Sequence, residues 1–144
     1  MTALLDVNVL IALAWPNHVH HDAARSWFVG QRTSGWATCA LTEAGFVRVS
    51  CNPAVVGHTV PPADAVGLLR RLRHLETHAF WPLDRSVVEL PAAILPRLQG
   101  YRQITDAVLL AAAIRHGGTL ATFDSGFVHL VPKADRHALC VIPV

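Results

Sequence analysis

The stretch LLDVNVLIAL, residues 4–13, places the polar side chains of Asp6 and Asn8 among residues that otherwise suit a protein interior. Burying a lone carboxylate costs several kcal/mol of free energy or forces the carboxyl group to take up a proton. Another group must therefore compensate the charge of Asp6.

Three further acids, Glu43, Asp106 and Asp124, border apolar segments in a similar way. Taken singly, each has an ordinary explanation, as a helix-start acid or a turn residue. Asp6 has no such explanation. The remaining acids stand in polar or helix-surface contexts, where solvation accounts for them: Asp22, Asp64, Glu76, Asp84, Glu89 and Asp135.

Alternating strands and helices must position these four acids. Apolar runs and turn signals predict strands at 3–6, around 36–38, at 80–81, at 119–123 and at 139–143. Helices are expected at 7–14, 20–31, 40–51, within 63–78, at 86–98 and at 105–116. This alternation predicts an α/β sandwich around a mainly parallel sheet.

In parallel α/β sheets, ligands bind outside the carboxyl ends of the strands, and all four acids are expected near that edge. Close carboxylates repel one another unless protons or cations lie between them. Hard oxygen ligands select Mg²⁺ or Mn²⁺ over softer metals. A divalent ion would therefore compensate Asp6, and Asn8 could orient a ligand or a bound water.

Composition limits the possible classes of protein. The chain has 144 residues and 52% hydrophobic residues, enough for one core, so we expect a single domain over 1–144. No apolar run approaches the roughly 18–20 residues of a membrane span, and the N-terminus lacks the basic start of a signal peptide, so we expect a cytoplasmic protein without a membrane partner. Three cysteines without a C-x-x-C pair argue against a disulfide framework or a thiolate zinc site. The net charge of +2 does not by itself identify a nucleic-acid binder.

Four motifs in order, LLDVNVLIAL, LTEAGFVRV, ITDAVLLAAA and ATFDSGF, resemble the PIN-domain ribonucleases, and more narrowly the VapC-type toxins of bacterial toxin–antitoxin pairs. The resemblance extends over nearly the whole chain. It implies a PIN-like three-layer α/β/α sandwich. It also implies that metal binding and catalysis involve Asp6, Glu43, Asp106 and Asp124, with Asn8 and Thr122 as supporting residues.

The resemblance further implies an RNA substrate, a homodimer and a cognate antitoxin that blocks the site. With one or two Mg²⁺ ions, or Mn²⁺ in their place, such a site would hydrolyse phosphodiester bonds with a metal-activated water. The expected products carry 5′-phosphate and 3′-hydroxyl ends. Arg102, four residues before Asp106, could reach a phosphate, although a role as a surface charge explains it equally well. The antitoxin is expected to cover apolar surface near the first helices, where Trp15 and Trp27 are available.

Other classes of function remain to be weighed. A catalytically silent RNA- or protein-binding module would keep the fold but would normally lose one of the acids. A phosphatase with an aspartyl nucleophile would require a second Asp where this chain has Asn8. A dinucleotide-binding domain is excluded because no G-x-G-x-x-G follows the first strand. The HVHH stretch at 18–21 suits a loop and a helix start better than a metal site.

Overall fold

The computed structural model describes residues 1–144 and is built around one five-stranded parallel sheet. The strand order is β3-β2-β1-β4-β5, and every neighbouring pair is parallel. The strands are β1 (Ala3–Leu5), β2 (Trp36–Cys39), β3 (His78–Trp81), β4 (Thr119–Thr122) and β5 (Leu139–Val141). Short strands without an apolar–polar alternation are typical of a sheet that is covered on both faces, and the predicted α/β/α sandwich is confirmed.

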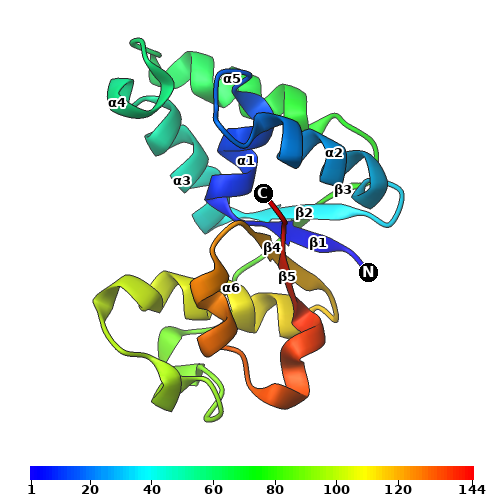
Figure 1. Ribbon diagram of the computed structural model, residues 1–144. Helices are drawn as coiled ribbons and strands as arrows, with labels where there is room; N and C mark the ends of the chain where they lie inside the picture. Colours follow the sequence, from blue (N-terminus) through cyan, green and yellow to red (C-terminus); the bar gives the residue numbers. More distant parts are fainter.

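Helices cover both faces of the sheet, as Figure 1 shows. One face carries α1 (Val7–Ala14), α2 (His21–Gln31), α3 (Ala40–Ser50), α4 (Pro53–Val56) and α5 (Pro62–Arg73). The other face carries α6 (Ile104–Arg115) and a series of short 3₁₀ helices. Because successive side chains of a strand point to opposite faces, Leu5 packs with the α1–α3 side and Leu4 with α6. None of the helices combines the length and the apolar character needed to cross a membrane.

The segment 86–98 differs from the prediction of one helix. It forms two short 3₁₀ helices, η1 (Val87–Glu89) and η2 (Leu95–Arg97). Pro91 and Pro96 explain the difference, because proline lacks the N–H that a continuous helix needs and its ring clashes with the preceding turn. The 3₁₀ helix η3 (Tyr101–Gln103) then leads directly into α6.

The single-turn helix α4 was not predicted either. It lies where the sequence favoured a loop after Asn52-Pro53. The Asn52 side chain accepts a hydrogen bond from the backbone N of Ala54 at 3.0 Å, and Pro53 occupies the first helical position, where its missing N–H costs nothing.

The strand order places a topological switch point between β1 and β4. From β1 the chain adds β2 and β3 on one side, and it later returns to add β4 and β5 on the other side. In open α/β sheets ligands bind at such a point, outside the carboxyl ends of the strands. The residues that follow β1 and β4 are therefore the first candidates for a functional site.

Candidate active site

Asp6 lies at the carboxyl end of β1 and caps the N-terminus of α1. One of its carboxylate oxygens, Oδ1, accepts a hydrogen bond from the backbone N of Val7 at 2.8 Å. The other, Oδ2, accepts one from the Thr122 hydroxyl at 2.7 Å. Burial raises the pKa of Asp6 above its usual value, the charge of Asp124 adds to this rise, and the two hydrogen bonds oppose it. The hydrogen bond from the start of α1 thus stabilises part of the Asp6 charge, but the effect of burial on the pKa is larger.

Thr122, the last residue of β4, connects the polar groups of this region. Its buried hydroxyl donates to Asp6 and accepts from the Asn8 side-chain amide at 3.2 Å and from the backbone N of Asp124 at 3.0 Å. The amide oxygen of Asn8 in turn accepts from the backbone N of Phe123 at 3.3 Å. Asn8 and Thr122, both expected as supporting residues, therefore hold Asp6 and the chain around Asp124 together.

Asp124 begins the turn into the 3₁₀ helix η4 (Ser125–His129). Its Oδ1 accepts a hydrogen bond from the backbone N of Gly126 at 2.8 Å, so the local turn role foreseen for this acid is real. The side chain nevertheless also borders a hollow that it shares with Asp6. Asp124 therefore combines a turn with a position at the site.

Asp106, in the first turn of α6, completes this group of acids. No hydrogen bond within the chain engages its carboxylate, which makes it the least compensated acid of the three. Burial, together with the charges of Asp6 and Asp124, raises the pKa of Asp106 to about 6. The three aspartates line one hollow of about 390 Å³, here called the aspartate hollow, together with Asn8, His18 and Phe127 among others.

The donor set of the aspartate hollow suits a hard divalent cation. Three carboxylates line it, and neighbouring carboxylate charge adds to burial in raising the pKa of Asp6 and of Asp106, an effect that a bound cation would relieve. No three His, Cys, Asp or Glu side chains are arranged to hold a metal ion by themselves. Mg²⁺ fits such a site nevertheless, because it usually keeps several waters and is bound through one or two carboxylates.

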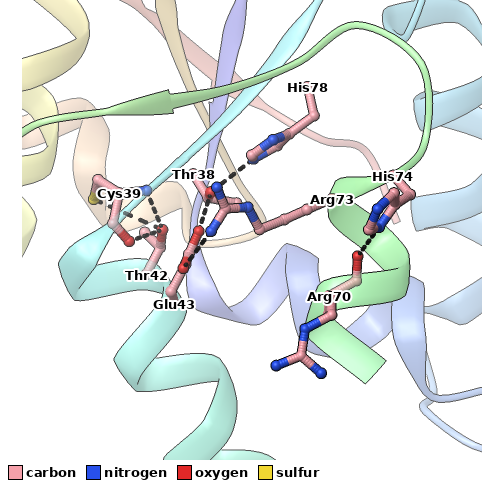
Figure 2. Close-up of polar contacts among 8 residues, drawn as sticks. All are labelled: Thr38, Cys39, Thr42, Glu43, Arg70, Arg73, His74 and His78. Atoms are coloured by element: carbon pink, nitrogen blue, oxygen red, sulfur yellow. Dashed lines mark hydrogen bonds and ion pairs between the residues drawn. The ribbon is translucent and has the colours of Figure 1, made fainter. Parts of the chain in front are cut away.

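Glu43, the fourth predicted acid, does not line the aspartate hollow, so the structure brings three of the four predicted acids together there. Its carboxylate accepts hydrogen bonds from the Thr38 hydroxyl at 2.6 Å and from Arg73 at 3.4 Å (Figure 2). Thr38 also bonds His78 of β3 at 2.8 Å. The reason is the direction of the helix: Ala44, one position further along α3, faces Asp6 and Asp106, while Glu43 is turned toward α5.

The predicted phosphate ligand Arg102 also lies away from the aspartates. Its guanidinium contacts the neighbouring Tyr101, through a hydrogen bond to the hydroxyl at 3.2 Å and by packing over the ring, and both residues are exposed. Two basic residues that the sequence did not single out for this role lie at the site instead: His18 borders the aspartate hollow, and Arg48 borders a second hollow beside it. The LTEAGFVRV motif contained a signal for Arg48, because a residue four positions after Ala44 lies on the same face of a helix as Ala44.

Comparison with known proteins agrees with this geometry. The family model described as PIN domain matches residues 3–131. The chain belongs to the PIN-domain family. Within it the chain is similar to curated VapC ribonucleases, so the predicted resemblance to the ribonucleases of this family is confirmed.

Three relatives from Mycobacterium tuberculosis, strain H37Rv, illustrate the similarity within the PIN-domain family. Ribonuclease VapC39 is 49% identical over 125 residues, which cover 87% of this chain and 90% of the relative. Ribonuclease VapC38 is 48% identical over 97% of this chain and 99% of its own length. Ribonuclease VapC44 is 42% identical over 99% of this chain and its full length.

A solved structure supports the fold independently. The crystal structure of VapBC2 from Rickettsia felis, bound to a DNA fragment from its promoter, superposes with a TM-score of 0.63 and covers 90% of this chain and 93% of the other. At 14% sequence identity this likeness concerns the fold alone.

Proposed function

We propose that this PIN-domain chain is a Mg²⁺-dependent endoribonuclease, the toxin of a toxin–antitoxin pair, which hydrolyses RNA phosphodiester bonds in the cytoplasm. The observation that carries the proposal is the aspartate hollow at the switch point of the sheet, which is lined by Asp6, Asp106 and Asp124. Burial and neighbouring carboxylates raise the pKa of Asp6 and of Asp106 there. The similarity to proteins named ribonucleases supports the reaction class.

The roles of the residues follow from their contacts. Asp6, Asp106 and Asp124 would hold the cation, with Mn²⁺ as a substitute for Mg²⁺. When bound, the ion would activate a water for in-line attack and neutralise charge on the phosphate. Thr122 and Asn8 fix the orientation of Asp6, because Thr122 donates to its Oδ2 and Asn8 holds Thr122.

No side chain of the hollow is needed as a nucleophile in this proposal. Attack by water rather than by the 2′-hydroxyl leaves 5′-phosphate and 3′-hydroxyl ends. Glu43 has no direct part in the proposed chemistry, because Thr38 and Arg73 engage its carboxylate on the α5 side.

An antitoxin is the proposed regulator of the site. The wall of the aspartate hollow is partly apolar, through Ile11, Val49 and Val55. In the loop between α1 and α2, Val19 is 85% exposed. An apolar segment laid over these side chains would close the hollow to RNA. Trp15 contributes less to such a surface than the sequence suggested, because it packs against the core and its indole N–H donates to Ser50 at 3.0 Å.

The test of the proposed function is cleavage of purified RNA by the wild-type chain, with the new 5′ ends mapped. We expect cleavage with Mg²⁺ that leaves 5′-phosphates, stops in EDTA and is suppressed by purified antitoxin. Asp106→Asn should lower the rate more than about 100-fold, since it removes a cation ligand that contributes several kcal/mol to the transition state.

Asp64→Asn is the matched control for this test, because Asp64 is an exposed acid in the first turn of α5, away from the hollow. It should cut RNA like the wild type. Cleavage that persists unchanged in EDTA, or in Asp106→Asn, would contradict the proposal. A phosphorylated protein intermediate would point to a phosphatase instead, and RNA binding without cleavage to a silent module.

A further inference from the structure

Two of the three aspartates, Asp6 and Asp106, also line a second hollow beside the aspartate hollow. This second space, of about 330 Å³ and here called the Arg48 hollow, is lined by Leu41 and Arg48 of α3 and by Thr105 among others. Asp6 and Asp106 line both hollows. A phosphate bound at the aspartates would therefore have neighbouring space on two sides.

Arg48 is exposed and unpaired although two carboxylates line the same hollow. The ion pairs of the chain are Arg73–Glu43 and Arg115–Asp84, and no hydrogen bond engages the Arg48 guanidinium. An arginine presents five N–H donors in a planar fork. Without an internal acceptor, these donors are available to a group from outside the chain.

We infer that Arg48 binds an RNA phosphate next to the one that the aspartates engage, so that a single-stranded backbone runs from the aspartate hollow into the Arg48 hollow. The inference rests on the proposed function and names the residue that holds the substrate beside the reacting bond. The arginine fork matches two phosphate oxygens, which makes arginine the suited cation at such a place.

The charge of the surroundings supports this position for a phosphate contact. A neighbouring phosphate in the Arg48 hollow would otherwise meet only the carboxylates of Asp6 and Asp106, which repel it. Arg48 offsets this repulsion on the side where α3 forms the wall. The half-apolar wall, with Leu41 and Leu109, offers contact to a sugar or a base face.

RNA is preferred over a protein ligand because the Arg48 hollow is continuous with the acids that are proposed to cut RNA. An acidic side chain of the antitoxin is the other anion that Arg48 could bind. The two cases differ in which ligand the loss of Arg48 affects, so both are measured below.

The experiment measures binding of a fluorescently labelled single-stranded RNA by anisotropy, in EDTA and with the Asp106→Asn chain as background. The background removes cleavage and one repelling charge. Arg48→Ala should weaken the affinity about tenfold, as expected for one charge-assisted contact. The slope of log K against log salt should fall by about 0.7, the value for one phosphate contact on a single strand.

Two further variants control the result. Arg71→Ala removes the same charge from an exposed side chain of α5 that lines neither hollow, and should change affinity less than about twofold. Arg48→Lys should keep the salt slope and recover only part of the affinity, since it keeps the charge and loses the fork. If Arg48→Ala does not fold, the affinity of Arg48→Lys for RNA tests the inference instead.

The outcomes separate the inference from the proposed function. If wild type cuts RNA but Arg48→Ala binds RNA as Arg71→Ala does, the inference is overturned. The inference is also overturned if no RNA binds the Asp106→Asn chain. It is likewise overturned if Arg48→Ala weakens binding of the purified antitoxin but not binding of RNA. If wild type cuts no RNA while Arg48→Ala still weakens binding, the proposed function fails and the phosphate contact stands.

Discussion

At the scale of single residues, Thr122 explains why the aspartates of the hollow are not equivalent. Its hydroxyl donates to Asp6 and accepts from Asn8 and from the backbone N of Asp124, which uses its full hydrogen-bonding capacity. Asp6 is therefore fixed by the network, and Asp106 has no such partner. Substitution by Asn should consequently have opposite effects on the stability of the metal-free chain at these two positions.

Asp106→Asn should stabilise the metal-free chain, and the gain should depend on pH. The pKa of Asp106 is raised to about 6 in the fold, against about 3.9 in an unfolded chain, so the folded chain holds this proton more tightly. Wild type therefore loses stability as the pH rises from about 4 to about 6, and the loss persists above that range. Asp106 is partly solvated, so we expect about 1 kcal/mol, or a gain of about 2–4 °C in Tm, for the variant at pH 8.

Thermal melts in EDTA at pH 4 and pH 8 check this expectation, with no difference between the chains expected at pH 4. Mg²⁺ should raise the Tm of wild type more than that of the variant at pH 8. Asp6→Asn is the contrast: its amide has only one acceptor oxygen, so it cannot accept from both the backbone N of Val7 and the Thr122 hydroxyl. This variant should lose about 1–3 kcal/mol of unfolding free energy at either pH. An Asp106→Asn chain that melts below wild type at pH 8 would contradict the assigned repulsion.

At the scale of elements, α3 presents different residues on two of its sides. The side with Ala44 and Arg48 forms the wall beside the aspartates, whereas Glu43 faces α5 and accepts from Thr38 of β2 and from Arg73. The Arg73 guanidinium also lies over the Phe80 ring of β3, 5.4 Å from its centroid. Glu43 thus links α3 to β2 and to α5.

Glu43→Gln should lower stability while leaving the response to Mg²⁺ intact. The variant loses a half-exposed ion pair and a charge-assisted hydrogen bond, together about 1–2 kcal/mol of unfolding free energy. Urea unfolding with and without Mg²⁺ measures both effects, and Glu76→Gln, at an exposed acid before β3, is the control. Loss of the Mg²⁺ response in Glu43→Gln would instead put this acid with the aspartates, as the sequence predicted.

At the scale of the whole molecule, the predicted homodimer has a candidate surface that does not line the aspartate hollow. The segment 87–104 exposes apolar side chains, with Val88 86% and Tyr101 80% accessible. These residues belong to the 3₁₀ helices on the α6 face, whereas the apolar wall of the aspartate hollow belongs to α1, α3 and α4. Two copies could pair there without covering the hollow.

Light scattering of the purified chain at about 10 μM should therefore give the mass of a dimer. Val88→Asp should shift the mass toward the monomer, because a charge buried in an interface without a partner costs several kcal/mol. Val19→Asp, at an equally exposed valine in the loop between α1 and α2, should leave the dimer intact. A strict monomer for wild type would contradict the expectation.

The sequence by itself determined the strands, most helices and the three aspartates that meet in the aspartate hollow. Asp6, Asp106 and Asp124 could be found because each interrupts or follows an apolar segment, and the strand ends of a parallel sheet bring such positions to one edge. Asn8 and Thr122 were expected from the same motifs. The prediction of one helix at 86–98 is wrong because Pro91 and Pro96 interrupt a segment whose apolar residues favour a helix.

Only the tertiary structure decided which side of α3 faces the aspartates. Glu43 and Arg48 are both polar and both lie on this helix, and the rotation of the helix against β1 and α5 assigns one to α5 and the other to the hollow. That rotation follows from the packing of Gly45 against Val7, where an added Cβ would come within 2.5 Å of a valine methyl group. Such a contact joins residues far apart in the chain, so no local pattern of the sequence could have specified it.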